Sequence, residues 1–158
     1  MSEAGDQLPD DPIERVREVL EKVADALGLD ADVTVEQDDE AIRGVLDGED
    51  LGLFIGRHGQ TIDAVQHLAF KVAAHGRSPA PRVEVDAAGY RERRRVALER
   101  QADQAAGDAV RSRRPVALDA MSANERKIVH EYLKDRDDVE TYSEGQEPDR
   151  HLVVAPLG

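Results

Sequence analysis

The chain has 158 residues, of which 40% are hydrophobic, only 3% are aromatic and none is cysteine. This length allows one ordinary domain or two small ones, and the absence of cysteine excludes a disulfide framework and a thiolate metal site. No apolar run approaches the roughly 20 residues that a membrane span needs, and the acidic, polar start of the chain is unlike a signal peptide. We therefore expect a cytoplasmic protein without membrane insertion.

The net charge of −13 opposes nucleic-acid binding at first sight, because phosphate neutralisation dominates that affinity. The excess lies in residues 1–50, which hold 17 acidic and 4 basic side chains, whereas residues 51–158 hold 17 of each. Residues 88–114 contain eight arginines and four acidic residues. The distribution leaves a polyanionic partner open, while the acidic first third favours solubility or tolerance of high salt.

The first half of the chain predicts the order helix, strand, strand, helical turn, helix, strand. Residues 1–11 are polar and aperiodic, which predicts an acidic, disordered N-terminus. Asp11 and Pro12 are typical of a helix start, and apolar residues at helical spacing extend the helix to Leu27. The remaining segments are a hairpin over 33–46, a helical turn at 51–55, a helix over 60–75 with Ile62, Val65, Ala69 and Val72 on one face, and a strand over 82–86.

The second half begins with a long polar helix over 89–111, whose narrow apolar side predicts one buried stripe. Residues 115–118 are typical of an edge strand. Ser122 and Glu125 form a capping-box pattern, which predicts a helix that turns Ile128, Val129, Tyr132 and Leu133 inward. Segments 139–142 and 151–155 predict a closing pair of strands.

The glycine-rich loop Ile55-Gly56-Arg57-His58-Gly59-Gln60-Thr61-Ile62 is the most informative segment. Two glycines three residues apart allow a tight turn and close backbone approach to a ligand. The free N–H groups of the helix that follows favour a phosphate, and Arg57 adds positive charge. A lone G-x-x-G is often only a turn between helices, so the spacing alone leaves both interpretations open.

In the context of its neighbouring elements, this loop resembles the signature of a KH domain, and the element order resembles the type II arrangement. The resemblance implies that Gly56 and Gly59 admit a single-stranded backbone, with Arg57 and His58 contacting it. It also implies that Ile55 and Ile62 shape an adjacent groove for bases.

A second candidate site lies on the capped helix, where Arg126 and His130 are four residues apart and share one face. Arginine can bind a phosphate with two nitrogens and histidine can add a hydrogen bond, although a solvated helix face also explains such a pair. The stretch from Arg95 to the C-terminus resembles the R-3-H domain, named for this Arg-x-x-x-His spacing, which binds single-stranded nucleic acid. Lys127 would support the pair, and Arg113 and Arg114 could extend its basic surface.

A KH domain followed by an R-3-H domain resembles the bacterial Jag family, the SpoIIIJ-associated or KhpB-like proteins. We expect an α+β fold of two small domains: a type II KH domain over 12–88 and an R-3-H domain over 89–158, joined by a long helix. Many members carry an additional N-terminal Jag domain, whereas about ten residues precede the first helix here. The resemblance implies a single-stranded RNA-binding regulator or RNA chaperone, linked in some bacteria to cell elongation and envelope growth, with a small single-KH-domain protein as partner.

Other functions are less well supported by the sequence. The five histidines show no metal-ligand spacing, and no cysteine nucleophile or G-x-S-x-G elbow occurs, so we expect no enzyme, no catalytic residue, no metal and no cofactor. A protein-interaction adaptor that uses a KH-type dimer surface is the main alternative. Single-stranded DNA binding is another, because the residue that reads a 2′-hydroxyl cannot be identified from sequence.

Overall fold

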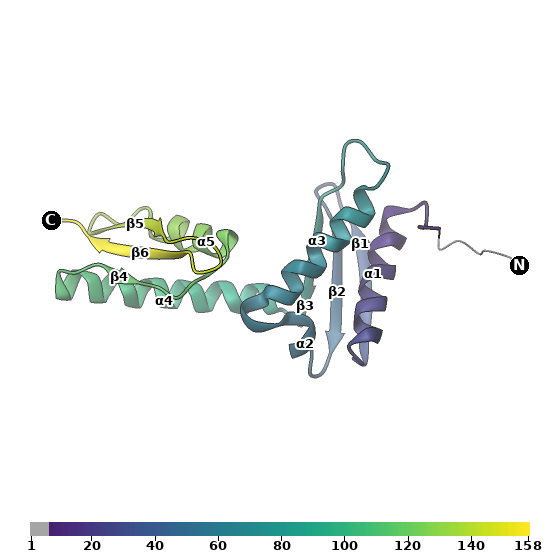
Figure 1. Ribbon diagram of the computed structural model, residues 1–158, viewed down its shortest axis with the longest axis horizontal. Coiled ribbons are helices and arrows are strands. Elements are labelled where there is room, and N and C mark those ends of the chain that lie inside the picture. Colours follow the sequence, from purple (N-terminus) through teal and green to yellow (C-terminus); the bar gives the residue numbers. More distant parts are fainter. Residues whose placement is uncertain (1–6) are drawn as a thin grey trace, which may run out of the picture. The chain divides into compact units, whose positions relative to one another are not determined.

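The computed structural model describes residues 7–158 as a mixture of helices and two three-stranded sheets (Figure 1). The chain divides into two compact units, the first ending at Arg91 and the second beginning at Glu92. The predicted boundary after residue 88 falls a few residues before this division. The expected α+β class with two small domains is confirmed.

Helix α1 (Pro12–Ala26) begins as predicted, because the Ile13 N–H donates to the Asp11 carboxylate over 2.9 Å. The predicted disorder of residues 1–6 lies outside the described residues. Residues 7–11 form no helix or strand, but the carbonyl of Pro9 accepts from Arg15 and that of Asp10 accepts from Arg77. These two bonds attach the described part of the N-terminal segment to the first unit.

The sheet of the first unit contains β1 (Ala31–Gln37), β2 (Ile42–Gly48) and β3 (Val83–Ala87), in the order β1-β2-β3. Strands β1 and β2 form the predicted antiparallel hairpin, and β3 pairs with β2 in parallel. The parallel pairing requires a crossover, which is supplied by the segment that contains the glycine loop. The C-terminal end of β3 therefore returns close to this loop.

Helices α2 (Gly52–Ile55) and α3 (Gln60–Ala74) occupy that crossover, and α3 packs beside α1 against the sheet (Figure 1). The core is aliphatic apart from Phe54, as the low aromatic content requires. The buried face of α3 contains Ala73 in place of the predicted Val72, because Val72 lies toward α1 at the rim of a surface groove.

The second unit consists mainly of α4 (Tyr90–Ser112), α5 (Ala123–Leu133) and a sheet in the order β4-β6-β5. The strands are β4 (Val116–Ala117), β5 (Val139–Glu144) and β6 (His151–Pro156), and both pairings are antiparallel. The small residues of α4 allow close packing, and the predicted buried stripe consists of Leu98, Ala102, Ala105, Ala106 and Ala109.

Two details of α5 differ from the sequence prediction. Ser122 caps the helix by accepting from the Glu125 N–H over 3.3 Å, but the Glu125 carboxylate pairs with Arg94 over 2.7 Å instead of completing a capping box. Tyr132, predicted to point inward, is exposed, and its hydroxyl donates to Asp103 over 2.8 Å. Both side chains interact with residues of α4, Glu125 with Arg94 and Tyr132 with Asp103, and sequence periodicity does not predict such contacts.

Candidate nucleic-acid interface

The glycine loop links α2 to α3 through a run of left-handed backbone conformations. Gly56 has φ 73° and ψ 176°, His58 has φ 53° and Gly59 has φ 75°. The conformation of Gly56 is almost restricted to glycine, whereas His58 occupies a region that a few polar side chains tolerate. The chain therefore turns within four residues and presents the middle of the loop to solvent.

Packing within the first unit also requires glycine at both ends of the loop. A Cβ atom on Gly56 would lie 2.2 Å from the Thr61 hydroxyl oxygen and 2.8 Å from the Thr61 backbone nitrogen. A Cβ atom on Gly59 would lie 2.7 Å from the hydroxyl oxygen of Tyr90. The sequence hypothesis attributes these glycines to phosphate approach, but the closed shape of the loop is a sufficient reason for them.

The side chains at the middle of the loop are the accessible ones. Arg57 and His58 are exposed, and within residues 7–158 neither makes a side-chain hydrogen bond or an ion pair. Ile55 is partly buried against the core. Ile62 has 0% of its surface exposed, so the prediction that it shapes a groove for bases is wrong: the periodicity that builds α3 turns it inward.

The N-terminus of α3 starts directly behind these two residues, at Gln60. The first N–H groups of a helix lack intrahelical acceptors, and the helix dipole makes this end positive. The one acidic side chain in the first turn, Asp63, is neutralised by Arg91 over 2.5 Å. The loop thus combines an exposed arginine with a helix end whose nearby carboxylate is already paired.

Arg126, the first residue of the Arg-x-x-x-His pair, is largely enclosed. Its side chain is only 10% exposed. One terminal nitrogen donates to the Met121 carbonyl over 2.6 Å, and the other donates to the Glu147 carboxylate over 2.9 Å. In this state Arg126 connects the segment before α5 to the β5–β6 loop.

The other two predicted residues on α5 are exposed. His130 hydrogen-bonds through Nδ1 to the hydroxyl of Thr141 on β5, so its ring orientation is set by the neighbouring strand. Lys127 is exposed, and among the described residues no carboxylate pairs with it. The accessible cationic and hydrogen-bonding groups of this surface are therefore Lys127 and His130, with Arg126 behind Glu147.

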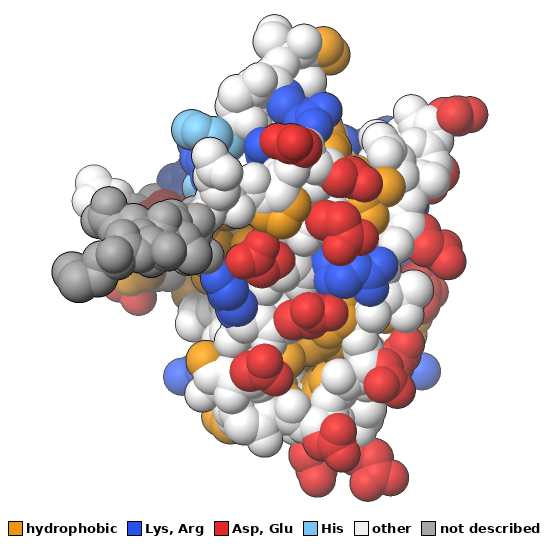
Figure 2. Space-filling model, turned by 90° about the vertical axis from the view of Figure 1, so that its right-hand side faces the viewer, with side chains coloured by type: hydrophobic (Ala, Val, Ile, Leu, Met, Phe, Trp, Pro, Cys, Tyr) orange, Lys and Arg blue, Asp and Glu red, His pale blue; other side chains and the backbone are white. Residues whose placement is uncertain are grey.

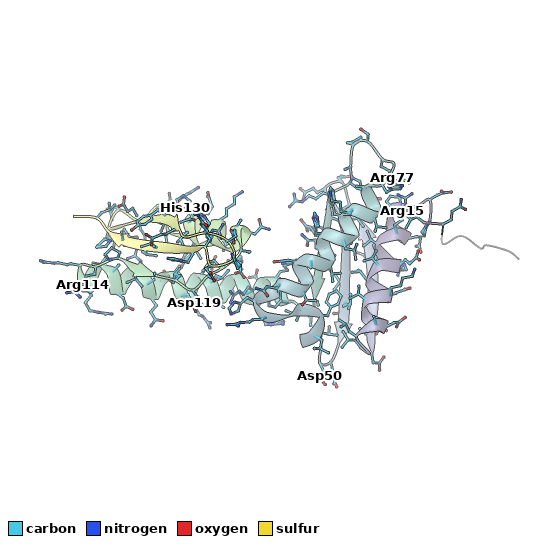
Figure 3. The ribbon with its side chains drawn as sticks, in the orientation of Figure 1. Arg15, Asp50, Arg77, Arg114, Asp119 and His130 are labelled. Atoms are coloured by element: carbon cyan, nitrogen blue, oxygen red, sulfur yellow. The ribbon has the colours of Figure 1, made fainter. Side chains whose placement is uncertain are left out.

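Arg113 and Arg114 are not gathered with this pair. Both lie just after α4, and Figure 3 places Arg114 at the C-terminal end of that helix, away from His130. Much of the arginine-rich stretch that precedes them is paired: Arg91, Arg94, Arg95 and Arg111 each contact a carboxylate. The local excess of arginine in the sequence thus overstates the cationic surface of the second unit.

The face of the first unit that carries α1 has a different character. Figure 2 shows acidic side chains spread around exposed hydrophobic ones on this face. The same unit has a groove between α1 and α3, whose apolar lining is Leu8, Val19, Val23, Leu68 and Val72. Such a surface repels a phosphate backbone, so it favours a nucleic-acid site at the loop end of the unit.

Two family models match the chain in the order that the sequence predicted. The model described as the KH domain of KhpA/KhpB matches residues 14–86, and the model described as the R-3-H domain matches residues 96–156. A relative from Bacillus subtilis (strain 168), named RNA-binding protein KhpB, is 32% identical over 147 residues, which are 92% of this chain and 71% of the relative. The chain belongs to the KhpB family.

Other KhpB relatives are longer than the matched region. The protein of that name from Clostridium symbiosum is 38% identical over 140 residues, which are 87% of this chain and 63% of the relative. The one from Lactiplantibacillus plantarum is 38% identical over 133 residues, 84% of this chain but 41% of the relative. The chain thus spans between about two fifths and two thirds of the length of these two KhpB proteins.

Sequence reasoning missed the partners that surround the Arg-x-x-x-His pair. Glu147 is 21 residues from Arg126, and no local sequence pattern predicts the contact between them. Thr141 is 11 residues from His130, again beyond the reach of a local pattern. The burial of Arg126 was detectable, because it precedes the buried Val129 and Leu133 by three and seven residues and so shares their face.

Within the described residues, no three His, Asp or Glu side chains form a group suited to a metal ion, and no helix is long and apolar enough to cross a membrane.

Proposed function

We propose that this chain binds single-stranded RNA at two surfaces, the glycine loop of the KH unit and the α5 face of the R-3-H unit. The observation that carries the proposal is the exposed, unpaired Arg57 beside His58 at the N-terminus of α3. Membership of a family whose relatives are named RNA-binding proteins supports RNA as the ligand. The mode of action is passive capture, without catalysis or a cofactor.

At the loop, the strand would be held mainly through its backbone. Arg57 would pair with a phosphate, and the α3 N-terminus adds a positive dipole end behind it. Phe54 is fully buried, and Phe70 and Tyr90 are partly buried, so the first unit offers few aromatic faces to stacking bases. Because stacking supplies much of the affinity of sequence-tolerant binders, we expect modest affinity with weak sequence preference.

At the R-3-H unit, Lys127 and His130 supply the exposed contacts, and Arg126 supplies a third one when its carboxylate partner moves away. Arg113 and Arg114 would contact the strand only if it extends to the end of α4. Neutralisation of about four phosphates across both surfaces predicts a log–log salt slope near −3, at roughly 0.7 per phosphate for single strands.

The test is a titration of a fluorescent single-stranded RNA of about 20 nucleotides with the wild type and two charge-reversal variants. Arg57→Asp changes the loop without altering either glycine. Arg82→Asp is the matched control, because Arg82 is also an exposed arginine of the first unit but precedes β3 at the end of the strand away from the loop. Substitution of Gly56 or Gly59 is unsuitable, since it would disturb folding as well as binding.

We expect Arg57→Asp to weaken binding about tenfold or more, because a charge-assisted contact is worth about 1.5–3 kcal/mol, while Arg82→Asp has a much smaller effect. Equal effects of the two variants would show a general charge effect and overturn the loop site. No binding by the wild type at low salt would overturn RNA binding altogether. A parallel titration with DNA of the same sequence tests the single-stranded DNA alternative.

Protein docking is the second candidate function, and the apolar groove between α1 and α3 is the observation that favours it. Leu68 lies in this groove with 49% of its surface exposed. A small single-KH-domain protein is the partner that we propose for this surface.

The proposal of RNA binding also includes a role as a cytoplasmic RNA regulator or RNA chaperone, with a link to cell elongation and envelope growth. This role depends on RNA binding.

A further inference from the structure

The β5–β6 loop places a carboxylate on the Arg126 nitrogen that would otherwise reach a ligand. Glu147 accepts from Arg126 over 2.9 Å, and its own side chain is 59% exposed. The geometry points to Glu147 as an internal competitor that occupies the phosphate position of Arg126 until RNA displaces it. This inference rests on the proposed RNA binding and names the residue that regulates it at the R-3-H unit.

The two nitrogens of Arg126 have different surroundings. The one that donates to the Met121 carbonyl makes a buried bond with the segment just before α5. That bond fixes the direction of the guanidinium group. The other nitrogen points toward the surface, where Glu147 covers it. A ligand can therefore replace Glu147 without disturbing the inner bond.

A largely enclosed arginine requires a hydrogen-bond acceptor at each covered nitrogen, and an anion is the most favourable acceptor. Glu147 meets this requirement in the free protein. A phosphate oxygen can meet it in the complex, since arginine binds carboxylate and phosphate with the same planar geometry. The exchange would leave the charge of Arg126 compensated throughout and would return Glu147 to water, which already reaches it.

The loop that carries Glu147 can release it with little disruption. The loop turns at Gly145, with φ 87°, and is closed by a bond from Arg150 to the Gly145 carbonyl over 2.7 Å. This closing bond does not involve Glu147. The paired β5 and β6 end at Glu144 and begin again at His151, so neither strand has to open for the carboxylate to move.

Competition of this kind would make binding selective for a strand that presents several phosphates. A single phosphate would have to displace Glu147 alone. A strand that also contacts the exposed Lys127 and His130 would offer its next phosphate at high local concentration. Arg126 would then engage only after the strand is aligned on α5.

The experiment compares Glu147→Gln with Glu144→Gln in the RNA titration used above, on the full chain. Glutamine keeps an oxygen that accepts from Arg126, so the fold is retained, but it removes the competing charge. Glu144 is the matched control, since it lies on the same hairpin with a similar exposure of 64% and does not contact Arg126. Hydrogen-exchange protection of the β6 amides in each variant verifies that the hairpin is intact.

We expect Glu147→Gln to bind RNA about two- to fivefold tighter than Glu144→Gln, a difference of about 0.4–1 kcal/mol, because the competing carboxylate, which is 59% exposed, is removed. Equal affinities of the two variants would overturn the inference while leaving RNA binding intact. Weaker binding by Glu147→Gln would also overturn it, because Glu147 would then be part of the bound state. Absence of binding by all variants and the wild type is instead the failure of the proposed function.

Discussion

The hydroxyl oxygen of Tyr90 lies 2.7 Å from the point that a Cβ atom on Gly59 would occupy. Tyr90 is the first residue of α4, and Gly59 is the last residue of the glycine loop before α3. The aromatic ring therefore closes the loop from the inside of the first unit. The shape that exposes Arg57 and His58 depends on a contact that the G-x-x-G pattern does not contain.

Substitution of Gly59 by alanine should destabilise the first unit by about 2–5 kcal/mol, since it adds left-handed backbone strain to a steric clash. Gly76→Ala is the matched control: Gly76 has φ 70°, but nothing lies within 4 Å of its added Cβ. The control should lose only about 1 kcal/mol from strain. Urea unfolding of both variants measures the difference in their stability. Equal losses of stability would show that the Tyr90 side chain moves away from the added methyl group without cost.

The pKa of Asp38 should lie well below the ordinary value of an aspartate. A hydrogen bond from Arg43 (2.9 Å), followed by backbone N–H bonds from Ala41 and Glu40, lowers the pKa of Asp38 from 3.8 to about 2. Because the folded pKa lies below the unfolded one, this contribution to the stability of the β1–β2 turn is complete above pH 4. It is lost as the pH falls through about 2.

An NMR titration of the Asp38 carboxyl carbon tests this expectation directly. In Arg43→Gln the midpoint should move up toward 3.8 but stay below it, because the two backbone N–H bonds remain. A midpoint near 3.8 in the wild type would contradict the turn geometry. A midpoint that Arg43→Gln leaves unchanged would instead assign the lowered pKa to the backbone alone.

The secondary structure of this chain could be predicted because its signals are local. Asp11 and Ser122 cap their helices as predicted, and the alternation around Val33 and Val35 marks a strand that pairs as expected. Each of these features depends on residues a few positions apart. The order of the two domains followed from motifs of the same short range.

The composition of the candidate site could be predicted only in part. Arg57, His58, Lys127 and His130 are exposed as required, but Ile62 is fully buried and Arg126 is covered by Glu147. Which side chain reaches solvent depends on contacts between segments distant in sequence, such as the β5–β6 loop against α5. A motif gives the residue types at a site, whereas tertiary packing decides which of them a ligand can contact.

Arg126→Ala should destabilise the second unit by about 2–4 kcal/mol, because it removes a buried hydrogen bond to the Met121 carbonyl and a charge-assisted hydrogen bond to Glu147. Lys127→Ala, on the next and exposed position of α5, should change stability by less than about 0.5 kcal/mol. Denaturant unfolding with hydrogen exchange at α5 and β6 distinguishes this unit from the first. Equal stability of the two variants would mean that the hydrogen bonds of Arg126 add nothing to the free energy of unfolding.

Thr141 should act as a positioning residue for His130. Its hydroxyl is bonded to Nδ1 of the imidazole, which leaves Nε2 as the ring nitrogen directed to a ligand. Thr141→Val keeps the shape of the side chain but removes this bond, so the ring can rotate and RNA affinity should fall about two- to fivefold.

Thr141→Ser supplies the decisive comparison, because it retains the hydroxyl and loses only a methyl group. If the serine variant binds RNA like the wild type and the valine variant binds more weakly, the effect is due to the orientation of His130. If both variants bind as weakly as His130→Ala, the hydroxyl alone does not account for the effect, and binding requires the hydroxyl and the methyl group of Thr141 together. If the valine variant binds like the wild type while His130→Ala is impaired, the imidazole reaches RNA without a fixed orientation, and the hydrogen bond to β5 serves the fold alone.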